Sequence, residues 1–523
     1  MTRLRCTIAL GAAAALYGAT HAPEAKRWWS HVLFLADDNL EGRETGSEGH
    51  RRAADYVAGE FERSGLKPAG TAAYIQPVKL RSRRIVEAQS SVALVRNGKR
   101  EPLALGEDCA VSMRAEPPEH LSAALVFVGY GLVAPEMKYD DLAGIDLRGK
   151  IAVYLAGGPS SIPGPLRSHY QSAGERAKVW QRAGAAGTVS LTGASESDLP
   201  WSRISASRLL PAMSLEDRAA PERLSIVVSP ARAEKFLGGS GHTLEELLAT
   251  SKAGKRLPVF PIPAVLEASV RVEHSALESQ NVAAIYPGTD PKLSSEFVVL
   301  SAHLDHLGRG KPVNGDAIYN GAMDNAAGIA TLLETAVALY QAGAKLKRSV
   351  LFVAVTGEEK GLLGSQYFAT DPTIKAEDMV ADLNVDMFLP LFPLRILRAI
   401  GAQESDLGDR LRAVAAPLGV AVQDDPEPQR NLFIRSDQYS FIQQGIPSLA
   451  FKVGYKPRSA EEAVARKWLA ERYHAPSDDV NQPVDLKAAG GFNRILLLLT
   501  ESIANQAERP KWKESSFFRR FAK

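Results

Sequence analysis

Three short groups of potential metal ligands follow one another between residues 296 and 364. They are His303-Leu-Asp305, the pair Asp324-Asn325 and the pair Glu358-Glu359. Imidazole and carboxylate are ligand types that zinc accepts, and a catalytic site uses three protein ligands so that one position stays open for water or substrate. A centre with two metal ions also needs a carboxylate that both ions share and a free carboxylate that moves protons. The residue types in this stretch fit such a hydrolytic metal centre.

Roles within this stretch follow from residue type, and structural roles compete with them. His303 and Glu359 can be terminal ligands, and Asp324 can be the shared carboxylate. Glu358 can be the carboxylate that binds no metal. Asp324-Asn325 before an apolar run also fits a helix N-cap. The two glutamates could instead be solvated acids at the start of a helix, where the helix dipole favours them.

The elements around these residues are predicted to be strand, helix and strand. Residues 297–302 and 350–355 are apolar, β-branched runs, and each ends where a candidate ligand group begins. Residues 328–340 place their apolar side chains on one face of a helix. In open α/β sheets the ligand crevice lies outside the carboxyl ends of the strands. We therefore expect the candidate ligands to meet at one edge of a sheet.

Two further candidate ligands lie downstream. Residues 380–386 alternate apolar and polar side chains and end on Asp386. His474 lies in a predicted loop before the closing helix, 486–506, and taken alone it could be an ordinary loop histidine. Together with the earlier group these residues make five potential ligands, most of them at predicted strand ends. Their order favours a joint metal site over five separate structural roles.

The ordered motifs carry a resemblance that no single motif would. They are His303-x-Asp305, Gly321-Ala-x-Asp-Asn-Ala-x-Gly328, Thr356-Gly-Glu-Glu-x-Gly-Leu-Leu-Gly-Ser365, Asn384-x-Asp-Met387, Arg435-Ser-Asp437 and Tyr473-His474-x-Pro. This set resembles the M28 family of dizinc exopeptidases, the group of aminopeptidase Y and the bacterial leucyl aminopeptidases. The likeness covers residues 28 to about 110 and 263–506. It implies two Zn²⁺ ions per subunit and a peptide substrate.

The resemblance also assigns roles to individual residues. It places His303 and Asp386 on one zinc ion and Glu359 and His474 on the other, with Asp324 between the two ions.

Three further residues receive catalytic roles from the same resemblance. Asp305 would hold the far nitrogen of His303 and fix its tautomer. Glu358 would deprotonate the bridging water and pass the proton to the leaving amine. Tyr473 would help to polarise the scissile carbonyl. Relatives commonly read Ser-Asp-His where this chain has Ser436-Asp437-Gln438, which puts in doubt any contact that this histidine makes.

The sequence pattern of a middle segment differs from that of the rest of the chain. Residues 116–261 contain short predicted strands between Gly- and Pro-rich turns, and stretches such as Val126-Phe-Val-Gly-Tyr-Gly131 resemble a protease-associated (PA) domain. The proline-spaced segment 257–263 is predicted to be a linker that closes this insertion. The predicted fold is a three-layer α/β/α zinc-exopeptidase fold with a mixed sheet, interrupted by a mainly β PA-like domain. Its catalytic parts are residues 26–115 and 262–509, and a basic tail, 510–523, is predicted to be mobile.

The N-terminus predicts export to the periplasm or the medium. Arg3 and Arg5 precede an apolar run, 8–16, and small residues follow, so residues 1–25 are interpreted as a signal peptide. A retained anchor is the alternative, but the run is shorter than the ~20 residues that span a bilayer. Cleavage would leave Cys109 as the only cysteine, so no internal disulfide can form.

Composition excludes some partners and leaves others open. The 62 basic residues nearly balance the 60 acidic ones, so the net charge gives no sign of a nucleic-acid-binding surface.

The predicted function is an aminopeptidase. A glutaminyl cyclase and a non-catalytic, transferrin-receptor-like binding protein are the rival interpretations. The polar turn 41–47 is interpreted either as a solvated loop or as a substrate contact. The sequence does not determine the oligomeric state.

Overall fold

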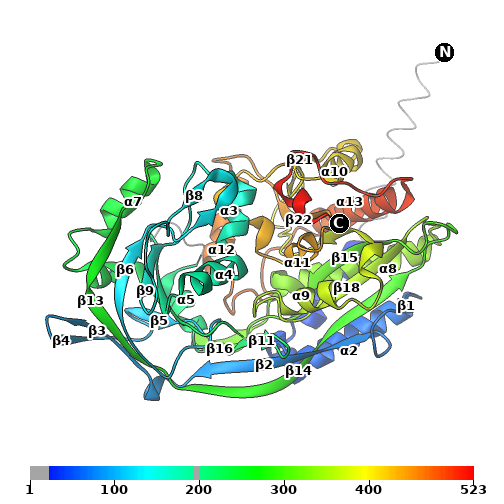
Figure 1. Ribbon diagram of the computed structural model, residues 1–523. Helices are drawn as coiled ribbons and strands as arrows, with labels where there is room; N and C mark the ends of the chain where they lie inside the picture. The colour runs from blue at the N-terminus through cyan, green and yellow to red at the C-terminus, as the bar shows by residue number, and fades with distance from the viewer. Residues whose placement is uncertain (1–22, 194–198, 219, 431, 523) are drawn as a thin grey trace, which may run out of the picture. The chain divides into compact units, whose positions relative to one another are not determined.

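The computed structural model describes residues 23–193, 199–218, 220–430 and 432–522 (Figure 1). Residues 1–22, which hold most of the predicted signal peptide, lie outside this range. The chain divides into two compact units. Unit 1 comprises Met1–Val78, Glu278–Pro426 and Arg435–Lys523, and unit 2 comprises Lys79–Leu277 and Glu427–Ile434. All of the candidate ligands belong to unit 1.

The sheet of unit 1 is mixed, as expected. From β14 onward its order is β14 (Val272–Tyr286), β18 (Ser349–Val355), β15 (Phe297–His303), β19 (Met379–Asn384), β22 (Ser448–Val453), β20 (Ile396–Ile400) and β21 (Ala421–Gln423). Strands β18, β15, β19 and β22 run parallel to one another, whereas β14 and β20 are antiparallel to their neighbours β18 and β22. β1 (Lys67–Pro68) pairs with β14. The apolar runs of β15 and β18 are explained by this arrangement, because central parallel strands are buried on both faces.

Helices cover both faces of this sheet, which gives the three layers predicted from the sequence (Figure 1). On one face, α2 (Glu48–Arg63), α8 (Ala327–Ala342) and α13 (Leu486–Asn505) share a buried cluster with Val298 and Leu300 of β15. On the other face, α9 (Leu363–Thr370) and α11 (Gln438–Ile442) pack with Val299 of the same strand. Alternate residues of a strand point to opposite faces, so one strand serves both cores.

Unit 1 also contains η1 (Asp38–Arg43), β16 (Gly308–Val313), β17 (Asp316–Tyr319), α10 (Leu407–Ala415), α12 (Ala460–Glu471) and η10 (Phe517–Phe521), among other short elements. Among the described residues, no helix is long and apolar enough to cross a membrane.

Unit 2 has its own eight-stranded sheet. The order is β4 (Lys99–Leu103), β3 (Ser91–Arg96), β13 (Val259–Ser269), β6 (His120–Val128), β9 (Ile151–Leu155), β10 (Gly187–Leu191), β12 (Leu224–Val228) and β5 (Cys109–Val111). Among the described residues of unit 2, the α-helices are α3 (Gly164–Gln171), α4 (Ala173–Ala183), α5 (Trp201–Ser207), α6 (Ala233–Leu237) and α7 (Leu244–Lys252). The unit contains the segment 116–261 and also takes in residues on both sides of it, because β3 and β13 pair from Ser91↔Ser269 to Val95↔Val265.

Two predictions about segments are wrong. The proline-spaced stretch 257–263 is largely strand, because Val259–Ile262 of β13 pair in register with β6. Successive N–H groups of a strand point to opposite edges, so two prolines that lie two residues apart remove donors from the same edge. β3 pairs with β13 from Val265 onward and therefore does not pair with Pro261 or Pro263. The C-terminal segment is packed rather than mobile, since Trp512 and Phe518 are buried.

Candidate metal centre

The candidate ligands converge because parallel strands end at the same edge of the sheet of unit 1. His303 is the last residue of β15, Asp386 follows β19, and Glu359 follows β18. Asp324 lies in the turn Ala322–Ala326 that leads into α8, and His474 lies just beyond α12. The structure therefore brings together all five residues that the sequence nominated as ligands, from segments up to 171 positions apart (474 − 303).

Asp324 lies between two groups of side chains. Its Oδ1 is 3.2 Å from Nε2 of His303, which is itself 3.8 Å from Oδ1 of Asp386. Its Oδ2 is 3.3 Å from Nε2 of His474, which is 3.2 Å from Oε2 of Glu359. One carboxylate that faces two ligand groups with different oxygens has the arrangement of a shared ligand.

The unpaired polar atoms at this site fit bound metal ions. Nε2 of His303, Oδ2 of Asp324, Oε1 of Glu359 and Oδ1 of Asp386 are buried and make no hydrogen bond. Buried polar groups are almost always partnered, and each specific exception needs an explanation such as an ion. Two of the carboxylates are also held in the charged form that a metal requires. Burial alone would raise the pKa of Asp324 and of Glu359, but the neighbouring imidazoles outweigh it and lower both pKa values.

Glu358 is electrostatically unlike its neighbour. Burial raises its pKa well above the usual range, and the like charges of Glu359, Asp437 and Asp386 add to the shift, against the opposing charge of His303. Among the acids that face the centre, it is suited to accept a proton rather than to hold a cation. Its backbone N–H donates to Oδ1 of Asp305 at 3.1 Å, which anchors the turn that carries it.

Asp305 contacts the far nitrogen of His303, as predicted, but through its backbone carbonyl rather than its carboxylate. Nδ1 of His303 lies 3.1 Å from the backbone carbonyl oxygen of Asp305, whereas the carboxylate is 4.0 Å away. The carboxylate is occupied by other donors, because it accepts a hydrogen bond from Oγ1 of Thr45 at 2.9 Å as well as the one from Glu358 N–H. The carbonyl still fixes the tautomer, since a proton on Nδ1 leaves Nε2 free to bind a metal.

Tyr473 packs against the candidate ligand next to it, with the two rings tilted at 39°. The rings of Tyr473 and His474 are 4.0 Å apart between centroids. Burial raises the pKa of the Tyr473 hydroxyl well above its ordinary value; the charge of Arg435 opposes this shift, and the acids of the centre add to it. The hydroxyl therefore stays protonated at ordinary pH, as a hydrogen-bond donor must.

A sequence comparison bears directly on this arrangement. The profile of peptidase family M28 matches residues 281–500, the range that contains every converging ligand. Residues 281–500 form a peptidase family M28 domain.

Curated relatives of this M28 domain match over part of their length. Leupeptin-inactivating enzyme 1 of Streptomyces exfoliatus is 28% identical over 197 residues, which cover 37% of this chain and 40% of that enzyme. A probable leucine aminopeptidase of Trichophyton verrucosum is 36% identical over 120 residues, which cover 22% of this chain and 31% of the relative. The chain thus spans less than half the length of these relatives.

A solved structure extends the likeness of fold to nearly the whole chain. The aminopeptidase from Aneurinibacillus sp. strain AM-1 superposes with a TM-score of 0.57 at 18% sequence identity, and the match covers 93% of this chain and 95% of that one. At this identity the likeness concerns the fold.

Several residues around the M28 centre were missed by the sequence analysis. Asp478 accepts hydrogen bonds from the backbone N–H groups of Met323 and Asp324 and so fixes the turn that carries the shared carboxylate. Lys452 Nζ lies 3.6 Å from Oδ1 of Asp386 and donates to the Asp386 carbonyl at 2.6 Å. Asp478 lies two positions after a loop proline, and Lys452 lies near the end of a strand. Both patterns are common in proteins, so the sequence alone does not mark these residues as part of a site.

The turn 41–47 is partly internal rather than a fully solvated loop. Arg43 is buried, and its guanidinium donates to the carbonyl oxygens of Leu304 at 2.9 Å, Asn320 at 2.7 Å and Gly321 at 3.0 Å. These carbonyls belong to the segments that carry His303 and Asp324. The turn is thus an internal clamp beneath the M28 centre.

Gln438, at the position where the resemblance led us to expect histidine, is buried. Its Oε1 accepts a hydrogen bond from Nδ2 of Asn384 at 2.7 Å, and the same amide donates to Oγ of Ser436 at 2.9 Å. The side chain supports the end of β19, two residues before Asp386.

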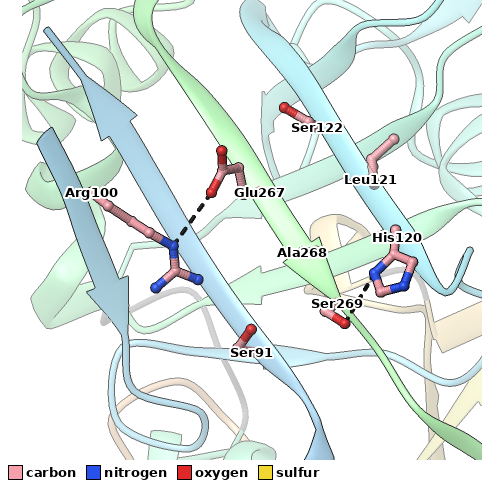
Figure 2. Close-up of a pocket in the computed structure, with 8 residues that line it drawn as sticks. All are labelled: Ser91, Arg100, His120, Leu121, Ser122, Glu267, Ala268 and Ser269. Atoms are coloured by element: carbon pink, nitrogen blue, oxygen red, sulfur yellow. Dashed lines mark hydrogen bonds and ion pairs between the residues drawn. The ribbon is translucent and has the colours of Figure 1, made fainter. Parts of the chain in front are cut away.

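Unit 2 has a surface hollow of about 330 Å³ on its sheet, lined by residues of β3, β4, β6 and β13 (Figure 2). Two pairs of its polar side chains contact each other. Arg100 bonds to Glu267 at 3.3 Å, and Ser269 bonds to His120 at 3.1 Å. Four of the eight lining residues are thus already engaged with one another.

Proposed function

We propose that the protein is a zinc-dependent aminopeptidase that uses two Zn²⁺ ions to remove the N-terminal residue of peptides. The observation that carries this proposal is the position of Asp324 between two ligand groups, with the raised-pKa carboxyl of Glu358 beside them. Two metal positions joined by a carboxylate, with a free base nearby, are the machinery of peptide hydrolysis. The choice of aminopeptidase is supported by the relative named as a probable leucine aminopeptidase.

The side chains divide the work as follows. His303, Asp386 and Asp324 would hold one ion, and the second would be held by the other oxygen of Asp324 with Glu359 and His474. When bound, zinc acidifies water and polarises a carbonyl. Glu358 takes the proton of the attacking water on its carboxylate and gives it to the departing amine. Tyr473 donates its hydroxyl hydrogen to the carbonyl oxygen as negative charge develops there.

We also propose that the protein acts outside the cytoplasm and that unit 2 is a PA-like domain. The charged and apolar pattern of residues 1–25 supports export. The inserted position of Lys79–Leu277 and its separate sheet support an accessory domain.

A panel of aminoacyl anilides and dipeptides, assayed with chelator and after zinc add-back, tests the proposed activity. We expect release of the N-terminal residue that chelator abolishes and zinc restores. Cyclisation of a peptide with N-terminal glutamine, without hydrolysis of the panel, would establish the glutaminyl cyclase alternative instead. Two bound zinc ions after dialysis with no turnover of any substrate would leave a binding protein.

A further inference from the structure

We propose that His306 is a sixth metal ligand of the M28 domain, coordinating through Nδ1 the ion held by Asp324, Glu359 and His474. This inference rests on the proposed two-metal function and deepens it. It makes the two positions unequal, because one would have four protein ligands and the other three.

The position of the ring supports a shared ion. Nδ1 of His306 is 2.9 Å from Oε1 of Glu359 and 4.0 Å from Oδ2 of Asp324. Ligand atoms of these three residues all lie within 4.8 Å of one another. The two oxygens of Glu359 face two different imidazoles, Oε1 toward His306 and Oε2 toward His474. Glu359 thus stands between two histidines in the way that Asp324 stands between His303 and His474.

The ring of His306 has no other polar partner. It is fully buried, and neither ring nitrogen makes a hydrogen bond, since even the short approach to Glu359 lacks hydrogen-bond geometry. A side chain that only filled space here would be apolar, because a buried imidazole without partners loses its hydration and gains nothing in return. Coordination through Nδ1 would supply a partner for that nitrogen.

The backbone is arranged to place this ring. The N–H of His306 donates to the Arg43 carbonyl at 3.2 Å, and Glu44 forms a parallel bridge with His306. The ring lies against Gly321, where an added Cβ would come within 2.5 Å of Cγ of His306. Gly321 has φ of +61°, a conformation that other residues rarely adopt. A glycine therefore makes room for the imidazole next to the turn that carries Asp324.

Unequal ligand number has a functional meaning. Structural zinc sites are closed by four protein ligands, whereas catalytic sites keep three and leave a position open. The position with His306 should hold its ion more tightly, and the position of His303 and Asp386 should be the one that exchanges its ion and its water.

The test uses the full-length protein loaded with Co²⁺ and counts the paramagnetically shifted imidazole N–H signals in proton NMR that disappear in D₂O. Each coordinated histidine contributes one such signal. We expect three in the wild type, from His303, His306 and His474, and two in His306→Gln. Two signals in the wild type would overturn the proposal, and this count needs no variant to fold.

Zinc titration against buffered chelators gives the second measurement. We expect two affinities in the wild type, and in His306→Gln a loss at the tighter one that exceeds the ~10-fold to 100-fold typical of removing an outer-shell partner. The control is His50→Gln, because His50 is also buried but its Nδ1 faces Oγ of Ser279 at 3.4 Å. Unchanged affinities in His306→Gln would overturn the inference while leaving the two-metal function intact. A wild type that binds no zinc would instead overturn the proposed function.

Discussion

Glu358 and Glu359 are adjacent in the chain but differ in what their environment does to them. Burial and like charges raise the pKa of Glu358, whereas imidazoles on both sides lower the pKa of Glu359. We predict that Glu358→Ala keeps both metals and loses activity by ~10²-fold to 10⁴-fold in kcat, the usual contribution of a general base. Metal analysis beside steady-state kinetics checks this prediction.

Glu359→Ala is the matched variant for that experiment. It should lose one zinc ion, and part of its activity should return with excess zinc, because a ligand contributes directly to metal affinity. If Glu358→Ala were depleted of metal and Glu359→Ala fully loaded, the two roles would have to be exchanged.

Asp382 lies on β19 below the centre and makes stability depend on pH. Burial, with the charge of Asp437, raises its pKa to about 8, although Ser301 donates to its Oδ1 at 2.7 Å. The folded protein therefore keeps a proton that the unfolded chain releases near pH 4. The contribution of Asp382 to the free energy of unfolding falls as pH rises from about 4 to 8. We predict that Asp382→Asn reduces this loss, by at most about 1.4 kcal/mol per pH unit.

Calorimetric melting at several pH values measures the effect of Asp382→Asn. The exposed carboxylate of Asp371 provides the control, and Asp371→Asn should leave the pH profile unchanged. A variant of Asp382 with the same pH profile as the wild type would show that its proton is not retained on folding.

At the scale of residues, the sequence predicted which side chains meet but not how each is used. The order of motifs nominated five ligands and Glu358, and the structure brings them together. Asp305 was nominated through its carboxylate, whereas its carbonyl holds His303, and sequence cannot distinguish two acceptors on one residue. His306 was overlooked because it directly follows Asp305 and no family role was attached to it.

The turn around η1 has an energetic role that belongs to the whole element. Arg43 joins three backbone carbonyls of the ligand-bearing segments. We predict that Arg43→Lys, which keeps the charge but loses the planar fork, lowers stability by at least ~3 kcal/mol, because hydrogen bonds of charged groups contribute about 1.5–3 kcal/mol each. It should also weaken zinc binding.

Thermal melting and zinc titration of Arg43→Lys measure both effects. Arg51→Lys is the control, since Arg51 is exposed and pairs with Glu48 and Asp55 on the surface of α2. Equal melting temperatures for the two variants would show that the hydrogen bonds of Arg43 add no stability beyond that of a surface arginine.

At the scale of elements, hydrophobic patterning predicted the strands and helices that build the sheet of unit 1. β15, β18 and β19 are apolar runs that end where expected, since buried parallel strands leave a continuous apolar signal. The turn 41–47 was not recognised as internal because its sequence is polar. Arg43 is buried there because its guanidinium donates hydrogen bonds to backbone carbonyl groups of segments that are distant in the sequence.

The C-terminal segment belongs to the body of unit 1. Phe518 is fully buried, Trp512 Nε1 donates to the Gly445 carbonyl at 2.8 Å, and Ser516 Oγ donates to Glu404 at 2.6 Å. We predict that truncation after Pro510 lowers the stability of unit 1, since burying one large apolar side chain contributes about 1.5–3 kcal/mol.

Melting curves of the truncated protein and of Phe518→Ala should both shift downward. Arg519→Ala, which changes an exposed residue, should melt like the wild type. An unchanged melting temperature after truncation would mean that the segment adds no net stability.

At the scale of the molecule, sequence texture separated a middle region but could not show how far its sheet extends. Residues before position 116 join the sheet of unit 2 because β3 pairs with β13 far along the chain. Pairings of this kind leave no local signal, since each strand alone reads as an ordinary β segment.

The buried charge of Arg43 also affects how the protein behaves before it binds metal. Burial lowers the pKa of Arg43 to about 10, while Asp478, Asp305 and Asp324 oppose the shift, so the guanidinium is charged at every physiological pH. The acids of the centre thus have a permanent counter-ion inside the fold before any zinc is present. A fold that balances these acids from within depends less on bound metal for its stability, so the protein should stay folded when a chelator removes the metal.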